Sequence, residues 1–202
     1  MTEIVVDSVW IRMRKDGEFD AVRRFPRWVL ILKAKHADRA MSMFIGPNEA
    51  NATSMQLAGM EHARPQTYTF ISRLLSGVKA KVERVTVSDL VDDTFLATVS
   101  LQAGRSHSEV DARPSDAINL ALSAGAPLFV NDAVLQRVGF AYAELMARLD
   151  ASVAGQDNEG LAWRSGVDWV RELEKREQAM MREMRATVQR AVRSQGRRSP
   201  AE

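Results

Sequence analysis

The stretch Asp111 to Val130, DARPSDAINLALSAGAPLFV, predicts a charged loop, a short helix and a buried strand in direct succession. We expect Ser115 to be the helix N-cap, because a serine hydroxyl accepts a free backbone N–H of the first turn. Asp116 would follow where the helix dipole favours a negative charge. Gly125 suits the left-handed conformation that ends helices, and Pro127 prevents continuation. The rest of the chain is arranged around this unit.

Three charged residues crowd the start of this helix: Asp111, Arg113 and Asp116. Charged groups on a loop held by rigid elements are where function concentrates. A functional interpretation is that Arg113 binds a phosphate or a carboxylate, while Asp116 holds a metal ion or an internal partner. A structural interpretation is that Ser115 and Asp116 cap the helix, while Arg113 ties the loop to the body through a salt bridge. The sequence leaves both open.

Alternating and continuous apolar segments predict a mixed α+β domain with a mostly antiparallel sheet and flanking helices. Asp92 and Asp93 fit a hairpin turn between two alternating segments, and Thr67 is the expected cap of a second helix. The expected strands cover residues 4–13, 28–32, 40–45, 81–87, 94–101, 106–110 and 128–130. The expected helices cover residues 47–59, 67–77, 115–125, 132–138 and 141–149.

Composition divides the chain into a domain and an appendage. Residues 1–150 form the expected α/β domain, and the small, polar residues 151–162 are typical of a linker. Apolar residues recur at near-heptad spacing over residues 163–193, which predicts a long amphipathic helix, although Glu174 and Glu177 break the apolar stripe. This helix would pack on its own body or on a second subunit, and the sequence leaves both open. Residues 194–202 are expected to be a disordered basic tail.

Composition also excludes several kinds of site. The 202 residues include no cysteine, which excludes disulfides, thiolate zinc sites and thiol nucleophiles and favours a reducing, cytoplasmic setting. Neither a signal peptide nor a membrane-spanning apolar run is expected. Residues 164–202 carry ten basic and six acidic residues, a net charge of +4, which leaves −2 for the rest of a chain of net charge +2. Nucleic-acid contact inferred from charge alone therefore concerns the tail first.

Several motifs resemble those of one known family. The run DARPSDAI at residues 111–118 precedes Leu-Ala-Leu at 120–122 and the strand APLFV. Further matching elements are Ile45-Gly46-Pro47 with Glu49 and Ala50, Arg64-Pro65-x-Thr67, and Thr94-Phe95-x-Ala97. Their order over residues 4–149 argues against chance agreement. The sequence is thus similar to the bifunctional nuclease (BFN) domain family.

This resemblance implies an α/β domain on a strongly curved or barrel-like sheet, commonly oligomeric, with RNase and DNase activity. The sequence departs from the family pattern at Tyr68-Thr69, where relatives often have His-Asp. If that His or Asp serves metal binding or proton transfer, the departure predicts weakened or absent activity. The C-terminal helix also lacks a clean match to the UVR motif that follows this domain in some relatives.

The candidate residues are of the types that phosphodiester hydrolysis uses, but they do not form a recognisable catalytic motif. We assign catalytic roles to Arg113, Asp116 and Glu49, the last through its place in a family motif, and substrate binding to Arg64 and Ser115. No metal ligands are assigned, and Mg²⁺ or Mn²⁺ stays open as a cofactor. The expected partners are RNA or DNA and further copies of the chain, with no membrane. The alternative is a catalytically inactive oligomeric binding or regulatory module whose Arg113 and Asp116 loop is structural.

Overall fold

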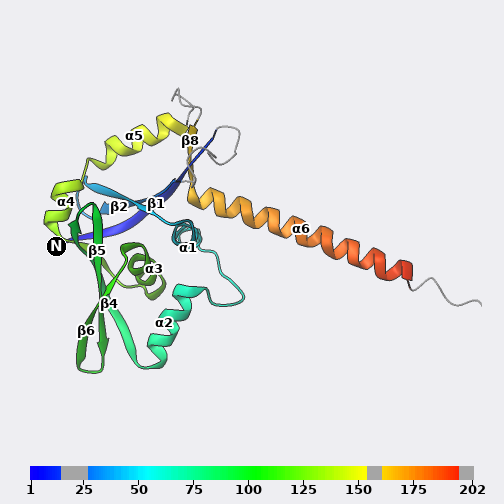
Figure 1. The fold of residues 1–202 in the computed structure, drawn as a ribbon, viewed down its shortest axis with the longest axis horizontal. Helices are drawn as coiled ribbons and strands as arrows, with labels where there is room; N and C mark the ends of the chain where they lie inside the picture. Colours follow the sequence, from blue (N-terminus) through cyan, green and yellow to red (C-terminus); the bar gives the residue numbers. More distant parts are fainter. Residues whose placement is uncertain (15–26, 154–160, 196–202) are drawn as a thin grey trace, which may run out of the picture.

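The chain is built around one long strand, β1 (Thr2–Arg14), which pairs antiparallel with three neighbours. The computed structural model describes residues 1–14, 27–153 and 161–195. One edge of β1 pairs with β2 (Arg27–Ala34). Along the other edge, the start of β1 pairs with β7 (Leu128–Val130) and its end pairs with β8 (Leu161–Ser165). Segments far apart in the sequence therefore meet on β1 (Figure 1).

The sheet has eight strands, and seven of them follow the order β3-β2-β1-β7-β4-β5-β6. The remaining bounds are β3 (Ala40–Ile45), β4 (Ala80–Val91), β5 (Thr94–Ala103) and β6 (Ser106–Ala112). Every pairing between these strands is antiparallel except that of β4 with β7. Strands β3 and β6 stand at the two ends of this order, and in the described residues they do not pair with each other. The mostly antiparallel sheet is confirmed, whereas the barrel-like closure is not.

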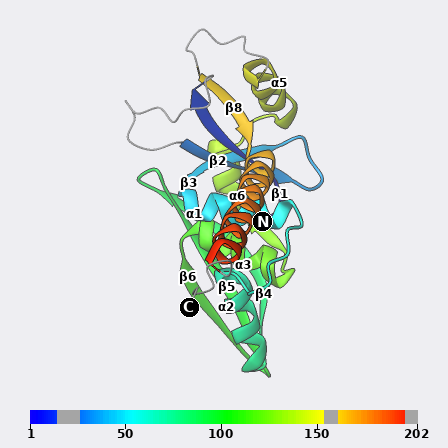
Figure 2. The same cartoon turned by 90° about the vertical axis from the view of Figure 1, so that its right-hand side faces the viewer.

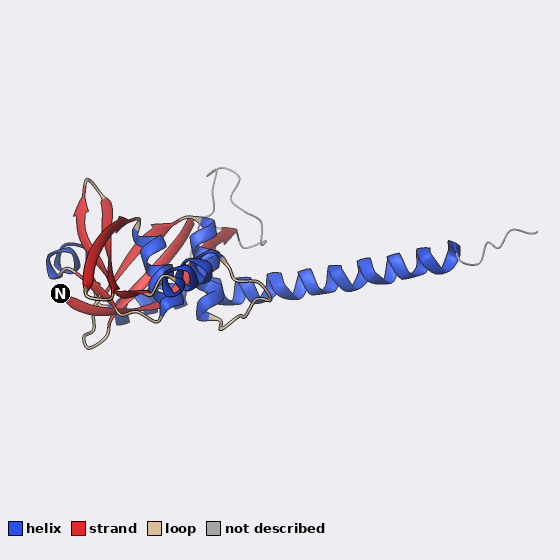
Figure 3. Ribbon diagram, turned by 90° about the horizontal axis from the view of Figure 1, so that it is seen from below, coloured by secondary structure: helices blue, strands red, loops and turns tan. Residues whose placement is uncertain are grey.

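Six helices accompany the sheet in the described part of the chain. Helix α3 (Pro114–Ala124) packs against α1 (Pro47–Leu57), α2 (Thr67–Gly77) and the strands β4 and β5. Helices α4 (Asp132–Val138) and α5 (Tyr142–Val153) follow β7. The last helix, α6 (Gly166–Gln195), packs against α1, β1 and β8 at its start and then extends away from the body (Figure 2, Figure 3).

The core lies between the sheet and the helices α1 and α3. Strand alternation turns every second side chain of β1 and β4 inward, and the apolar face of α3 packs on them. Complete burial of each of these aliphatic side chains contributes about 1.5 to 3 kcal/mol to folding. The largest fully buried side chains are Ile4, Ile11, Leu30, Ile31, Leu32, Met41, Ile118, Val9, Val85, Val87 and Val130.

Two predicted helix caps were wrong. The N-cap of α3 is Arg113 rather than Ser115, and neither it nor the N-cap of α2 makes a side-chain capping bond. Pro114 explains the earlier start of α3, because proline has no N–H to satisfy and its fixed φ suits the first helical position. The N-cap of α2 is Gln66, one residue before the expected Thr67. The predicted end of α3 is confirmed, since Gly125 is left-handed with φ 64° and ψ 26°.

The C-terminal elements also begin elsewhere than the sequence pattern indicated. Strand β8 occupies residues 161–165, where the end of a linker and the first turn of a helix were expected. Helix α6 starts at Gly166 instead of Trp163, and it continues to Gln195. A five-residue strand such as β8 exists because it pairs with β1, which no local pattern reveals. The predicted basic tail lies largely outside the described residues.

Candidate functional site

Arg113 stands at the start of α3 and forms ion pairs with two carboxylates. Its Nε donates to Oδ2 of Asp116 at 2.6 Å, and its Nη2 donates to Oε1 of Glu49 at 2.7 Å. The Arg113 side chain is 68% exposed, whereas that of Glu49 is 13% exposed. The fold thus brings together all three residues that the sequence marked as catalytic, although Glu49 and Arg113 are 64 residues apart.

Glu49 reaches Arg113 from the first turn of α1. Gly46 is the N-cap of that helix, followed by Pro47, as the sequence predicted. A Cβ built on Gly46 would overlap Oε2 of Glu49. A glycine at this position therefore leaves room for the Glu49 carboxylate.

Tyr68 completes the group from the first turn of α2. Its hydroxyl donates to Oδ1 of Asp116 at 2.6 Å, so both Asp116 oxygens accept hydrogen bonds. We call Glu49, Tyr68, Arg113 and Asp116 the Arg113 cluster. Its members lie at the N-terminal ends of α1, α2 and α3, which therefore meet at one place. Helix N-termini carry partial positive charge, so this arrangement favours anions.

The cluster fixes the charge states of its members. Burial would raise the pKa of Asp116, but hydrogen bonds from Arg113 and Tyr68 and the Arg113 charge together hold it below its usual value. Burial and the hydrogen bond to Asp116 raise the pKa of Tyr68. The hydrogen bonds to Asp116 and Glu49 raise the pKa of Arg113. At neutral pH the cluster contains an ionised Asp116, a charged Arg113 and a neutral Tyr68.

Asn119 lies beneath the cluster and joins α1 to α3. Its side chain is fully buried, and its Nδ2 donates to the backbone oxygens of Glu49 and Ser115 at 3.1 and 2.9 Å. Its Oδ1 accepts from Thr53 Oγ1 at 3.1 Å and from Gln56 Nε2 at 2.8 Å. Every hydrogen-bonding atom of this amide has a partner, so the relative position of the two helices is tightly specified.

The two residues assigned to substrate binding lie in different surroundings. Ser115 is half-buried in the first turn of α3, directly beside the cluster. Arg64 is exposed before α2, and no ion pair or hydrogen bond joins it to another described residue. Tyr68, rather than Arg64, is the residue of this part of the chain that bonds to the cluster. Of the three histidines, His107 on β6 faces Glu83 on β4 at 2.9 Å and is not hydrogen-bonded to any member of the cluster.

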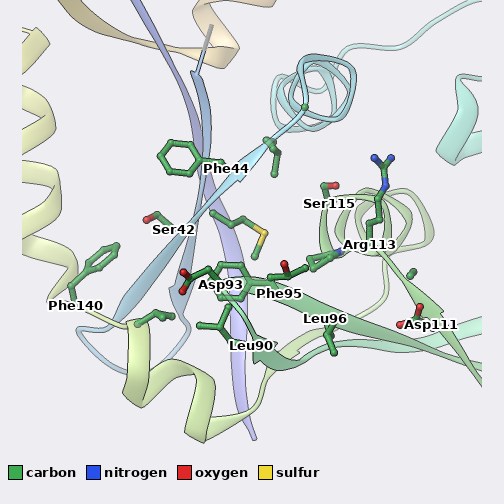
Figure 4. A pocket seen from close by; sticks show the side chains of 17 residues that line it. Ser42, Phe44, Leu90, Asp93, Phe95, Leu96, Asp111, Arg113, Ser115 and Phe140 are labelled. Atoms are coloured by element: carbon green, nitrogen blue, oxygen red, sulfur yellow. The ribbon is translucent and has the colours of Figure 1, made fainter. Parts of the chain in front are cut away.

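A cavity of about 830 Å³ adjoins the cluster between β3, the start of β5 and the start of α3 (Figure 4). Met43, Leu90 and Phe95 give it an apolar lining, and the start of α3 with Ser115 borders one side. The Arg113 guanidinium points from this border toward α1. Volumes of this size hold small organic ligands or single nucleotides.

The carboxylates at this cavity are Asp93 and Asp111. Both are exposed, and neither forms an ion pair or a hydrogen bond with another described residue. Asp93 and its neighbour Asp92 have positive φ angles of 59° and 47°, which confirms the predicted tight turn between β4 and β5. The cavity rim is thus acidic apart from Arg113, whose charge Glu49 and Asp116 already balance.

A divalent cation does not fit the cluster as it stands. Both oxygens of Asp116 accept hydrogen bonds, Glu49 is held by Arg113, and the guanidinium would repel a cation placed between them. In residues 1–14, 27–153 and 161–195, no group of three or more His, Asp or Glu side chains could hold a metal ion.

Within the same ranges, no helix combines the length and apolar character needed to cross a membrane.

Sequence reasoning missed two residues of the site. Tyr68 entered only as a departure from a family pattern, because nothing local shows that its hydroxyl reaches Asp116. Asn119 was not singled out, although a lone amide between Ile118 and Leu120 was a usable signal. A polar side chain on a buried face needs partners, and here it finds four.

These features define an α+β domain in which three helix starts converge on one charged cluster. A family model described as the bifunctional nuclease domain matches residues 30–143, which contain the whole cluster. The chain belongs to the bifunctional nuclease domain family. The sequence resemblance to this family is thereby confirmed.

Two proteins of Mycobacterium tuberculosis are similar to this chain. They are the uncharacterized protein MT1877 of strain CDC 1551 / Oshkosh and the uncharacterized protein Rv1829 of strain ATCC 25618 / H37Rv. Each is 34% identical over 111 residues, which cover 55% of this chain and 66% of the relative. The match spans just under two thirds of these relatives, and their names state no activity.

Proposed function

We propose that this protein hydrolyses phosphodiester bonds in RNA and DNA and that Arg113 binds the reacting phosphate. The observation that carries the proposal is the convergence of Glu49, Arg113 and Asp116 in one cluster of a bifunctional nuclease domain. The forked N–H donors of an arginine guanidinium match the spacing of phosphate oxygens, and helix N-termini favour bound anions. Three such N-termini meet at the cluster, so the surroundings of Arg113 favour a phosphate.

Arg113 is held in place but keeps donors for a ligand. A guanidinium has five N–H donors. One on Nε and one on Nη2 bond to Asp116 and Glu49, and no other described residue takes the rest. The exposed side chain would present those remaining donors to phosphoryl oxygens, while the two carboxylates fix its orientation. Such preorganised donors stabilise the charge that develops during phosphoryl transfer.

The other assigned residues have supporting roles in this proposal. Asp116 and Glu49 orient Arg113, and Tyr68 orients Asp116. Ser115, at the cavity, and the exposed Arg64 would contact the substrate on either side of the reacting phosphate. A divalent cation such as Mg²⁺ or Mn²⁺ would need carboxylates that Arg113 now occupies, so no step of the proposal depends on one. We also propose that the protein works in the cytoplasm and as a homo-oligomer.

A second candidate is a catalytically inactive binding or regulatory module. The acidic rim of the cavity, Asp93 and Asp111, favours it, because unpaired carboxylates repel the phosphates of a nucleic acid. Tyr68 also favours it, since its raised pKa makes the hydroxyl a poor proton donor to a leaving group at neutral pH. In this candidate the cluster is purely structural, and the cavity binds a small ligand.

A cleavage assay separates the two candidates. The full chain is incubated with single-stranded RNA and DNA, in EDTA and with Mg²⁺ or Mn²⁺, beside Arg113→Ala and the double variant Arg113→Ala, Asp116→Ala. The matched control is Arg105→Ala, an exposed arginine in the turn between β5 and β6. We expect Arg113→Ala to lower the cleavage rate about 100-fold or more and Arg105→Ala to leave it unchanged.

Circular dichroism confirms that each variant is folded. If Arg113→Ala cleaves the substrates as fast as the wild-type chain, the Arg113 cluster takes no part in the mechanism. A wild-type chain that cleaves neither substrate under any of the three conditions leaves the binding module as the function.

A further inference from the structure

We propose that α6 pairs antiparallel with α6 of a second copy of the chain. The proposal rests on the homo-oligomer proposed above and not on nuclease activity. The start of α6 is fixed to its own body, where Val170 is buried and the ring of Trp169 meets Trp28 edge-on at 6.4 Å. From Leu173 to Arg185 every side chain is exposed. The helix therefore leaves the body after about two turns (Figure 1, Figure 3).

The exposed part of α6 carries an apolar stripe. Its large apolar side chains are Leu173, Met180, Met181 and Met184. At 3.6 residues per turn these positions lie on the same face as the buried Val170. The face that docks on the body thus continues beyond it as far as Met184. Glu177 interrupts this stripe, and exposed apolar side chains gathered on one face of a helix mark an interaction site.

The charges of α6 favour a second copy in the opposite direction. Residues 166–177 hold four acidic and three basic side chains, a net charge of −1. Residues 178–195 hold one acidic and four basic side chains, a net charge of +3. An antiparallel pair sets the negative half of each helix against the positive half of the other. A parallel pair would set the two positive halves side by side, which is unfavourable.

A two-fold axis fits the middle of α6. Met181 lies near the midpoint of Gly166–Gln195, so an axis there sets the acidic half of each helix against the basic half of the other copy. The two bodies would then lie at opposite ends of the helix pair, where they do not collide. Each copy would cover the apolar stripe that the other leaves exposed.

Solution mass tests the pairing. Light scattering on the full chain at micromolar concentration should give twice the mass of one chain. The double variant Met180→Glu, Met184→Glu should give a monomer with an unchanged circular dichroism melting curve for the body. The control Gln178→Glu, Ala179→Glu adds the same charge away from the stripe and should remain a dimer. A monomeric wild type overturns both this pairing and the homo-oligomer, whereas a Met180→Glu, Met184→Glu dimer overturns only the pairing.

Cysteine cross-linking tests the direction, because the chain has no cysteine of its own. Met181→Cys should form a disulfide dimer on mild oxidation, since disulfides need Cα atoms within about 7 Å of each other. Leu173→Cys should not, because an antiparallel pair separates its two copies by roughly 24 Å along the helix axis. It should instead cross-link to Val188→Cys in a mixture. If Leu173→Cys cross-links to itself, the two helices are parallel. If Leu173→Cys cross-links to Leu74→Cys, α6 docks on α2 instead. Either result overturns the proposal.

Discussion

Tyr68 and Asp116 lie 48 residues apart in the sequence and meet through a hydrogen bond of 2.6 Å that joins α2 to α3. The same carboxylate holds Arg113, so Tyr68 acts on the exposed guanidinium through Asp116. The second tyrosine, Tyr142, makes an equivalent bond to Asp7 at 2.7 Å at a different place in the fold. This pair of similar bonds provides an internal control.

We expect Tyr68→Phe to lower the free energy of unfolding by about 1 to 2 kcal/mol, because a half-buried hydrogen bond to a charged group is lost. Tyr142→Phe should have a similar effect on stability, measured by urea unfolding. Only Tyr68→Phe should also lower the cleavage rate, because only Tyr68 touches the cluster. Equal cleavage rates in the two variants would show that the orientation of Asp116 does not matter for the reaction.

Tyrosine ionisation gives a prediction for pH. Burial and the bond to Asp116 raise the pKa of Tyr68, and burial and the bond to Asp7 raise the pKa of Tyr142 to about 12. Tyrosine in an unfolded chain titrates near pH 10. A pKa raised in the folded state stabilises the fold fully below the unfolded value, and this stabilisation is lost as the pH rises through the folded value. Stability should therefore fall between about pH 10 and pH 12.

The two tyrosines are the only ones in the chain, so the ultraviolet absorbance of tyrosinate reports on both. The native protein should show almost no tyrosinate at pH 10, where the urea-unfolded chain is about half ionised. A native titration curve that coincides with the unfolded one would contradict both hydrogen bonds.

Local signals in the sequence predicted the elements well. Asp92 and Asp93 form the expected turn, and Gly125 with Pro127 ends α3 as expected, because these residues act through their own backbone preferences. Ser115 was wrongly expected to be the cap, because the capping preference of serine competes there with the preference of Pro114 for the first helical position. The helix-starting proline before it moved the cap to Arg113.

Long-range contacts were beyond the sequence. Strand β8 depends on pairing with β1, from which it is separated by most of the chain. The bonds of Asp116 to Tyr68 and of Arg113 to Glu49 form because three helix starts meet, and no spacing rule predicts that meeting. The sequence therefore indicated the candidate residues Glu49, Arg113 and Asp116, whereas the hydrogen bonds between them depend on the fold.

Gly46 tests whether the position of Glu49 matters. In Gly46→Ala the new Cβ would overlap the Glu49 carboxylate, so we expect Glu49 to move away from Arg113 and the cleavage rate to fall by up to about 100-fold. The control is Gly77→Ala, which meets no atom within 4 Å and should slightly stabilise the end of α2. The kinetic assay is repeated in a Glu49→Gln background. There the Gly46→Ala effect should largely vanish, and an undiminished effect would mean that Gly46 acts by another route.

Asn119 is the last test, and it addresses the scaffold beneath the cluster. Asn119→Ala removes four hydrogen bonds and leaves the backbone oxygens of Glu49 and Ser115 buried without that partner. A buried polar group left unsatisfied costs about 1 to 3 kcal/mol, so we expect a loss of about 3 kcal/mol in the free energy of unfolding. Urea unfolding measures this loss.

Asn131→Ala is the matched control for Asn119→Ala, because Asn131 is exposed, accepts one capping bond from Ala133 N and donates one bond to the Ser88 backbone oxygen. Losing such a cap costs about 1 kcal/mol. If the two variants lose the same stability, the buried amide is no more important than a surface cap, and another contact must fix α1 against α3. A larger loss at Asn119 means that the amide sets the distance between the two helix starts, and with it the reach of Glu49 to Arg113.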